Sequence, residues 1–269
     1  FWQLVGVYNL GKPLGRRCVT RYGGDVIVLT QNGAFPLSAA IQSAAINYST
    51  ALSFKIQNAF TEAARDYGST FGWIPIVYPD QSALIVNIPI SENGEHEQYV
   101  MNTITKAWCK FTEWDAEDFV IFNSKLYFVT STKVVLAWYL HVDGTADIIA
   151  YGKQAFSYFG APGTLKKFTL YRPVLSTNGS ITFATDIDID FQEHQLSGNT
   201  SASSLAFARW DRSYWDVGLW GNSQEIVKQW TSPAEWQGYA AAGKVQVSTN
   251  ALTIQWMAND IVWESGGIV

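Results

Sequence analysis

The chain has 269 residues, of which 48% are hydrophobic and 15% aromatic, including 12 Trp. This length and apolar content suffice for one large or two medium domains, each with its own hydrophobic core. Charged residues make up only 15%, below the roughly 25% typical of globular chains. Two interpretations follow: a surface covered by partner proteins, or a β protein rich in uncharged polar residues.

The net charge of −5 argues against a dedicated nucleic-acid-binding surface, which normally carries a basic stripe. The basic trio Arg16, Arg17 and Arg21 is therefore interpreted as a solvated rim. No apolar run reaches the roughly 18 residues needed to span a bilayer, and no signal peptide is visible. The chain begins with Phe1, so we expect a processed protein or part of a longer one.

Asn-Gly and Asp-Gly turn pairs recur along the chain, flanked by short β-branched and aromatic runs, a pattern typical of β-hairpins. The pairs lie at residues 32–33, 93–94, 143–144 and 178–179. In the first half we predict four hairpins: 25–30 with 34–37, 73–78 with 83–90, 97–104 with 107–112, and 119–122 with 125–130. The two cysteines, Cys18 and Cys109, do not form a disulfide framework and are predicted to be free thiols.

One region of the first half differs in texture. Ile56, Phe60 and Ala63 fall at helical spacing, which predicts a helix over residues 52–66, preceded by a shorter one over 38–47. Gly68 is the expected C-cap. This helical insertion, near residues 38–66, interrupts an otherwise β-rich sequence.

After residue 149 the predicted strands lengthen. Residues 167–176 and 181–191 are expected to form a long hairpin, followed by a loop over 193–204. Further strands are predicted at 206–210, 215–220, 225–230, 244–248 and 253–263. This number of strands suits an antiparallel sandwich.

We therefore predict a mainly β chain with two domains. Residues 1–148 are expected to form partial β-propeller blades with the helical insertion, and residues 149–269 an antiparallel β-sandwich-like domain. A blade takes about 40–50 residues, so the first domain supplies roughly three blades. Because a propeller closes with about four to eight blades, further blades are expected elsewhere in the natural protein or in a partner.

Few residues suggest chemistry. His96, His141 and His194 are scattered and lack the clustered spacing of metal ligands. No nucleophile elbow, Walker loop or dinucleotide fingerprint is present. We predict that the chain is not an enzyme, has no catalytic, cofactor-binding or metal-binding residues, and carries no cofactor.

Asp186, Asp188 and Asp190 alternate with Ile187 and Ile189. At strand periodicity the three carboxylates share one face and the isoleucines the other. An EF-hand needs Gly at the position that Phe191 occupies. We expect a solvated face, with a weak cation site and a glycosidase-like acid pair as the alternatives.

The second half is rich in Trp, which favours core and interface packing, with sugar-stacking platforms as the alternative. The residues are Trp210, Trp215, Trp220, Trp230, Trp236, Trp256 and Trp263.

Several runs are more specific than composition: residues 22–38, 98–115, 122–128 and 166–173. Together they resemble a family of virion proteins of short-tailed bacteriophages, similar in role to tail nozzle, hub or packaged-DNA stabilisation proteins. The likeness extends from about Val19 to the C-terminus. Within the second run, Trp108 is expected to pack under the neighbouring blade.

The resemblance implies a structural tail component that forms part of a ring through which DNA passes without sequence-specific binding. It implies a homo-oligomeric ring, expected to be a hexamer, with other tail or portal-adaptor proteins as partners and no membrane span. The expected location is the virion tail, after synthesis in the host cytoplasm. The alternatives are a carbohydrate-binding propeller or adhesin and a glycosidase-type propeller.

Overall fold

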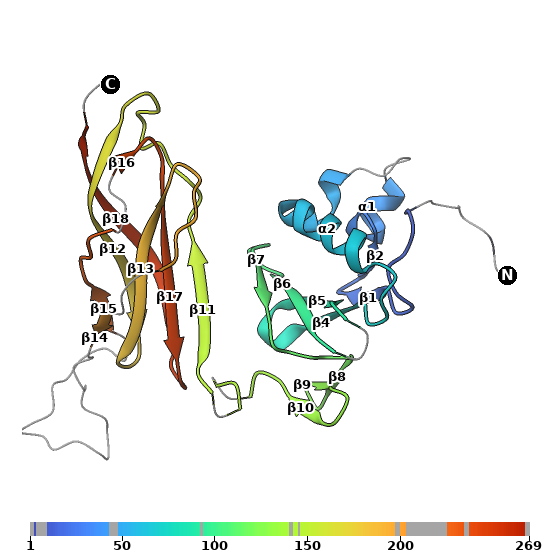
Figure 1. The fold of residues 1–269 in the computed structure, drawn as a ribbon. Coiled ribbons are helices and arrows are strands. Elements are labelled where there is room, and N and C mark those ends of the chain that lie inside the picture. The colour runs from blue at the N-terminus through green and yellow to red at the C-terminus, as the bar shows by residue number, and fades with distance from the viewer. Residues whose placement is uncertain are drawn as a thin grey trace, which may run out of the picture. The chain divides into compact units, whose positions relative to one another are not determined.

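The computed structural model describes residues 3, 10–42, 48–91, 94–139, 142–144, 146–196, 200–202, 225–233 and 237–266. The prediction of a mainly β chain is confirmed, since 51% of it is strand. The chain divides into two compact units, residues 1–139 and 140–269 (Figure 1). The predicted strands 206–210 and 215–220 lie outside the described residues.

Unit 1 (residues 1–139) contains three small antiparallel sheets in which each strand pairs with its neighbour in sequence. The first sheet is β1 (Val19–Tyr22), β2 (Asp25–Thr30) and β3 (Gly33–Pro36). The second is β4 (Ile74–Tyr78), β5 (Ala83–Pro89), β6 (His96–Asn102) and β7 (Trp108–Phe111). The third is β8 (Asp118–Phe122), β9 (Lys125–Val129) and β10 (Val134–Leu136). No propeller is formed by the part of the chain that the structure describes.

The four hairpins predicted in this unit are confirmed as β2–β3, β4–β5, β6–β7 and β8–β9. The β8–β9 turn shows why the residues of a short turn are sufficient to predict a hairpin. Asn123 and Ser124 have φ angles of 48° and 60°, the left-handed pair that a two-residue hairpin turn requires. Local turn chemistry therefore specifies the register of these hairpins.

The helical insertion consists of α1 (Leu37–Gln42), the short 3₁₀ turns η1 (Tyr48–Thr50) and η2 (Leu52–Ile56), and α2 (Gln57–Tyr67). The predicted helix over 52–66 is confirmed, with its first turn wound as 3₁₀. The shorter predicted helix is matched by α1 as far as residue 42, and residues 43–47 lie outside the described part.

Gly68 stands at the C-cap of α2, as expected, but with a right-handed φ of −65°. Glycine is needed here for space and not for a positive φ angle, because a Cβ at this position would lie 2.2 Å from the carbonyl oxygen of Ala64. The glycine thus allows the chain to turn closely under the last turn of the helix.

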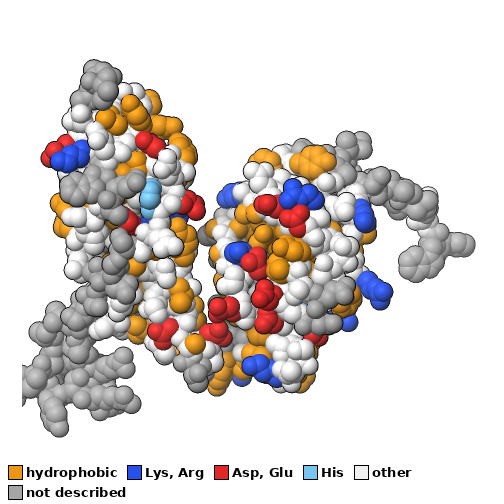
Figure 2. Space-filling model, viewed as in Figure 1, with side chains coloured by type: hydrophobic (Ala, Val, Ile, Leu, Met, Phe, Trp, Pro, Cys, Tyr) orange, Lys and Arg blue, Asp and Glu red, His pale blue; other side chains and the backbone are white. Residues whose placement is uncertain are grey.

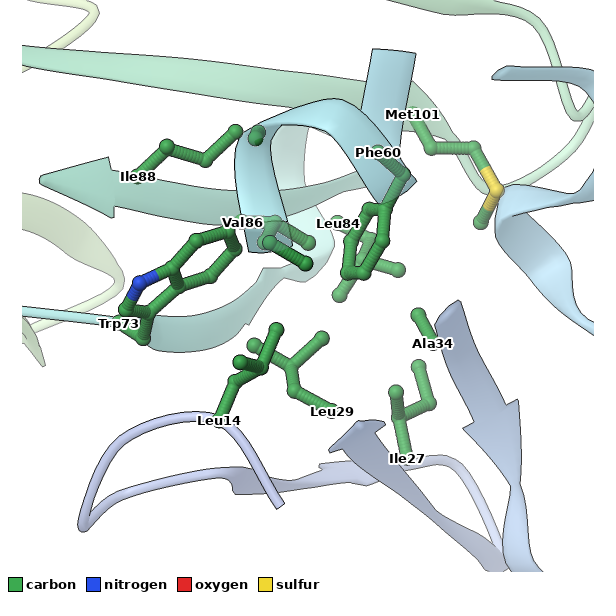
Figure 3. Close-up of a cluster of buried hydrophobic side chains, with 12 residues drawn as sticks. Leu14, Ile27, Leu29, Ala34, Phe60, Trp73, Leu84, Val86, Ile88 and Met101 are labelled. Carbon is green, nitrogen blue, oxygen red and sulfur yellow. The ribbon is translucent and has the colours of Figure 1, made fainter. Parts of the chain in front are cut away.

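The main core of unit 1 lies where α2 packs against the sheets (Figure 3). Phe60 of α2 meets Trp73, with ring centroids 6.0 Å apart, and Leu29 and Val86 lie beside them. The indole Nε1 of Trp73 donates to the carbonyl oxygen of Tyr67 at 2.8 Å. Burial of the ring and satisfaction of its N–H together tie the end of α2 to the start of β4.

Trp108, expected to be packed under a neighbouring element, lies half-buried at the margin of this core. Its Nε1 donates to the carbonyl oxygen of Leu52 at 3.0 Å. Cys109, the next residue, and Cys18 are both free.

Unit 2 (residues 140–269) has two antiparallel sheets around one core. The first sheet follows the order β11 (Ile148–Lys153), β17 (Ala241–Thr249), β13 (Ile181–Ile189) and β14 (Thr200–Ala202). The second follows β15 (Glu225–Lys228), β12 (Lys166–Thr177) and β16 (Gln237–Gly238), with β18 (Ile254–Ser265) paired to β12. The sequence prediction placed the boundary after residue 148, whereas β11 already begins there and pairs with β17.

The long hairpin predicted from 167–176 and 181–191 is wrong. The two strands exist as β12 and β13, but β12 pairs with β15, β16 and β18 while β13 pairs with β14 and β17. Leu175 and Ile181, at the two ends of the turn, both point into the shared core. Because each strand carries a long apolar face, stacking them in opposite sheets buries both faces at once.

The core of unit 1 gives a stability prediction. Trp73→Ala should lower the free energy of unfolding by about 3–5 kcal/mol, because it empties a buried aromatic site and removes a hydrogen bond to the helix end. Chemical denaturation of the chain measures the loss. Phe71→Ala, which truncates an exposed ring two residues away, is the matched control, and an equal loss for both variants contradicts the core assignment.

Candidate functional site: a buried charge cluster in unit 2

The alternating aspartates occupy β13 and the residue that follows it. Ile187 and Ile189 point into the core, so the predicted division into two faces is confirmed. The predicted solvation is wrong, because Asp186 is only 2% and Asp188 only 1% exposed. Asp190 alone of the three is exposed.

Asp188 lies between two lysines from the neighbouring strands. Its Oδ1 accepts a hydrogen bond from Lys244 Nζ of β17 at 2.5 Å, and its Oδ2 lies 2.8 Å from Lys153 Nζ of β11. Lys244 is 1% exposed. The carboxylate is therefore neutralised inside the protein by cations from two other strands.

Strand register explains how these residues meet. Lys244 is directly opposite Lys153 on one side and Asp186 on the other. Directly opposed residues of antiparallel strands project their side chains to the same face. Asp188, two residues beyond Asp186, shares that face. The cluster thus forms one row across β11, β17 and β13, on the face that turns away from the aliphatic core.

The segment after β13 covers this row. Asp190 and Phe191 have left-handed φ angles of 49° and 65°, and they turn the chain back over the sheet. Glu193 Oε1 then accepts from Lys153 at 2.8 Å. The backbone of His194 donates to Asp188 Oδ1 at 3.1 Å, and its carbonyl oxygen accepts from Lys244 Nζ. Residues 190–194 therefore supply hydrogen bonds that the buried Lys244 ammonium and Asp188 carboxylate need.

The surroundings of Asp188 and Lys153 keep both side chains charged. Burial by itself would raise the pKa of Asp188, but hydrogen bonds from Lys153, Lys244 and the His194 backbone outweigh it and hold the pKa below its ordinary value. Burial would likewise lower the pKa of Lys153, and its bonds to Asp188 and Glu193 raise it instead. Both groups therefore carry their charges near neutral pH.

Asp190 has a separate role at the entrance to β17. Its Oδ1 accepts hydrogen bonds from the backbone N–H groups of Tyr239 and Ala240 at 2.8 and 2.9 Å. Gly238 leaves space for this contact, because a Cβ there would lie 2.7 Å from Asp190 Oδ2. Asp190 therefore links the turn after β13 to the residues that precede β17.

This geometry disfavours two of the alternatives for the aspartates. A glycosidase acid pair has to reach a sugar, whereas Asp186 and Asp188 are buried. A cation at Asp188 would be repelled by the two ammonium groups that contact it. No group of three or more His, Cys, Asp and Glu side chains with metal-holding geometry occurs among the described residues.

The two histidines that the structure describes, His96 and His194, belong to different units. His96 is buried in unit 1, where its Nδ1 lies 2.8 Å from the carbonyl oxygen of Gly94. His194 belongs to the covering segment of unit 2, and His141 lies outside the described residues. Of the basic trio, Arg17 forms an exposed ion pair with Asp118.

Of the tryptophans in the second half, some pack against the core of unit 2, one is partly exposed, and the others are not described by the structure. Trp256 and Trp263 of β18 pack against the unit 2 core. Trp230 is partly exposed, and the guanidinium carbon of Arg172 lies 4.3 Å from the centre of a Trp230 ring. The other tryptophans named in the sequence analysis lie outside the described residues: Trp210, Trp215, Trp220 and Trp236.

Sequence reasoning missed both lysines of the cluster. The signal was present for Lys244, which stands in the strand Ala-Ala-Gly-Lys-Val-Gln-Val that reads as buried on both faces. A lone lysine in such a strand requires an acidic partner. The acidic run was visible at residues 186–190, but nothing local showed that the two strands pair.

A scan of protein-family models gave no match to the chain, and a search of curated proteins gave none either. No helix in the described ranges has the length and apolar character needed to cross a membrane.

The cluster gives a prediction for Asp188. Asp188→Ala should destabilise unit 2 by about 3–5 kcal/mol, because it leaves two ammonium groups facing one another without their shared anion. Denaturant unfolding measures the effect. Glu193→Ala removes a carboxylate that also binds Lys153 but is 81% exposed, and should change stability by less than about 1 kcal/mol. Equal effects of the two variants contradict the buried role of Asp188.

Asp190 gives a second prediction, in which the two replacements differ. Asp190→Ala should cost about 1–3 kcal/mol, since it removes two acceptor contacts and places alanine in a left-handed conformation. Asp190→Asn keeps an acceptor oxygen and tolerates that conformation, so its loss should be smaller. Thermal unfolding of the two variants side by side tests this order, and a larger loss for asparagine refutes it.

Proposed function

We propose that the chain is a non-enzymatic structural component of the short tail of a bacteriophage, of the nozzle or hub type. In this proposal, copies form a ring through which DNA passes. The observation that carries it is the edge strand β11, which pairs with β17 on one side and with no other described strand on the other, and which exposes apolar side chains on both of its faces. Ile149 is 66% and Tyr151 58% exposed, and they lie on the same face, while Ile148 and Ala150 are exposed on the other.

An edge strand of this kind is a template for association. Proteins that remain monomeric protect their sheet edges with charges, prolines or bulges. The only charged residue of β11 is Lys153, and it is turned into the buried cluster. Residues 148–151 therefore offer apolar side chains together with an outer backbone edge that no described strand covers, which suits a surface covered by a neighbouring subunit.

Other apolar side chains are exposed on both units, and Figure 2 shows hydrophobic groups on the visible face of each. In unit 1 the hairpin of β8 and β9 exposes Val120 and Phe122, and the nearby β10 exposes Val134. Together with the 15% of charged residues, this distribution supports a protein that is surrounded by partners. The partners proposed are further copies and other tail or portal-adaptor proteins in the virion.

The sheets support a finer fold proposal. In unit 1, three sheets built from sequential antiparallel strands have the connectivity of propeller blades. We propose that they act as blades completed by strands from elsewhere in the assembly. In unit 2, two antiparallel sheets around one core have the layering of a β-sandwich.

The charge balance fits a passage for DNA. A basic lumen would hold the phosphate backbone, whereas a net charge of −5 gives weak repulsion and lets the duplex slide. Sequence-specific contacts are not needed for this role. The proposed ring is a hexamer assembled in the virion tail after synthesis in the host cytoplasm.

The edge strand gives a test of assembly. Ile149→Lys should block incorporation of the protein into virions, because it places a charge on the surface proposed to be covered. The circular dichroism spectrum and melting temperature of the isolated chain should stay close to wild type. Complementation followed by mass spectrometry of purified particles measures incorporation.

Ile104→Lys is the matched control, since Ile104 is 77% exposed in the turn between β6 and β7 and is not part of a strand. It should leave incorporation unchanged. Absence of the wild-type protein from purified particles, together with a monomeric state at high concentration, would refute the tail proposal. Normal incorporation of Ile149→Lys would refute the role of β11.

A carbohydrate-binding adhesin is the second candidate, and Trp230 is the observation that favours it. This partly exposed indole stands beside Arg172, whose guanidinium binds Asp260 Oδ2 through Nε at 2.9 Å and Nη2 at 2.5 Å. An aromatic ring with adjacent polar groups can stack on a sugar. Binding on a glycan array that disappears in Trp230→Ala would favour this candidate over the tail component.

A further inference from the structure

We propose that Lys244 and Asp188 join covalently, through an amide bond between Lys244 Nζ and Asp188 Cγ that cross-links β17 to β13. This inference concerns unit 2 alone and is independent of the function proposed above. The contact that carries it is the 2.5 Å approach of Nζ to Oδ1 between two residues that are each 1% exposed. A nucleophile and a carboxyl carbon held together without water have the proximity that amide formation requires.

The surrounding groups match the parts of an acyl-transfer site. Lys244 is the nucleophile and Asp188 Cγ the electrophile. Lys153 Nζ, 2.8 Å from Asp188 Oδ2, is a cation placed where negative charge develops when the amine adds. Asp186, opposite Lys244 in the strand register and buried, is a carboxylate placed to relay protons.

The reaction balances without any further reactant. The N–C bond forms between Nζ and Cγ, and the bond between Cγ and Oδ1 breaks. Two of the three ammonium protons leave with Oδ1 as water, and the third stays on the amide nitrogen. Oδ2, held by Lys153, becomes the amide oxygen. Exclusion of bulk water from the cluster disfavours the reverse hydrolysis.

The ion pair is the resting state of the site. Because hydrogen bonds from Lys153, Lys244 and the His194 backbone hold the pKa of Asp188 below its ordinary value, the neutral carboxylic acid that the amine attacks is a minor form of Asp188. The cross-link is therefore expected to form after folding and slowly. The experiment has to follow the mass of the folded protein over time until it no longer changes.

Intact-mass spectrometry of the full chain tests the proposal. The wild-type protein, incubated at neutral pH until its mass is constant, should become lighter by one water. Protease digestion should release a branched peptide that joins the segments containing Lys244 and Asp188. A mass that stays at the sequence value would overturn the proposal, as would a branched peptide joining other residues.

Two variants separate this reaction from other losses of water. Lys244→Arg retains a cation beside Asp188 but lacks the amine nucleophile, so it should keep its full mass; loss of water in this variant would overturn the assignment. Asp143→Glu removes the Asp143-Gly144 pair, which can itself lose water by cyclising to a succinimide. This variant should still lose water as the wild type does, and retention of its full mass would overturn the proposal.

Asp186→Asn tests the proton relay. The amide keeps the size of the side chain but cannot accept and return a proton, so the branched peptide should accumulate more slowly than in wild type. The circular dichroism spectrum and melting temperature of this variant should stay close to wild type, which shows that it is folded. A wild-type rate of water loss in a folded Asp186→Asn protein would overturn the relay role and leave proximity as the sole cause of the reaction.

Discussion

A buried carboxylate needs a cation beside it, and this requirement shapes the first sheet of unit 2. Asp188 is held by Lys244 and Lys153, so β13, β17 and β11 are locked in one register by charge as well as by backbone hydrogen bonds. A slip by one residue would turn the lysines into the aliphatic core and the isoleucines toward the charges. The cost of an unpaired buried charge thus selects a single alignment of the three strands.

The same cluster organises the chain that follows β13. Without the backbone groups of His194, both Lys244 and Asp188 would lack part of their hydrogen bonding. The left-handed residues Asp190 and Phe191 return the chain to this point, and Asp190 then binds the loop that enters β17. One face of the sheet is therefore closed by polar contacts, while the other is closed by the second sheet through apolar burial.

Unit 1 is organised differently, by short-range turns and by the packing of helix α2. Each of its sheets connects only strands that are adjacent in sequence, which requires little long-range information. Helix α2 adds a long-range contact, because its Phe60 meets Trp73 and the strands beneath it. Unit 1 is built from hairpins specified by local sequence, whereas unit 2 depends on pairing between strands distant in the chain. The strand pairing of unit 1 could therefore be predicted from sequence more completely than that of unit 2.

Local patterns in the sequence were sufficient to predict the elements of unit 1 and the alternation of β13. Short turns and period-two patterns act over a few residues, so the hairpins of β2–β3, β4–β5, β6–β7 and β8–β9 were predicted correctly, as was the helix ending before Gly68. The placement of β12 and β13 in opposite sheets and the contact between Lys244 and Asp188 depend instead on long-range packing. Strand pairing across 56 residues of chain depends on which faces can be buried together. Local sequence shows only that Asp186 and Asp188 share a face of the strand. Either water or a buried lysine can supply the hydrogen bonds that such carboxylates need. Lys244 supplies them to Asp188 because β17 packs beside β13.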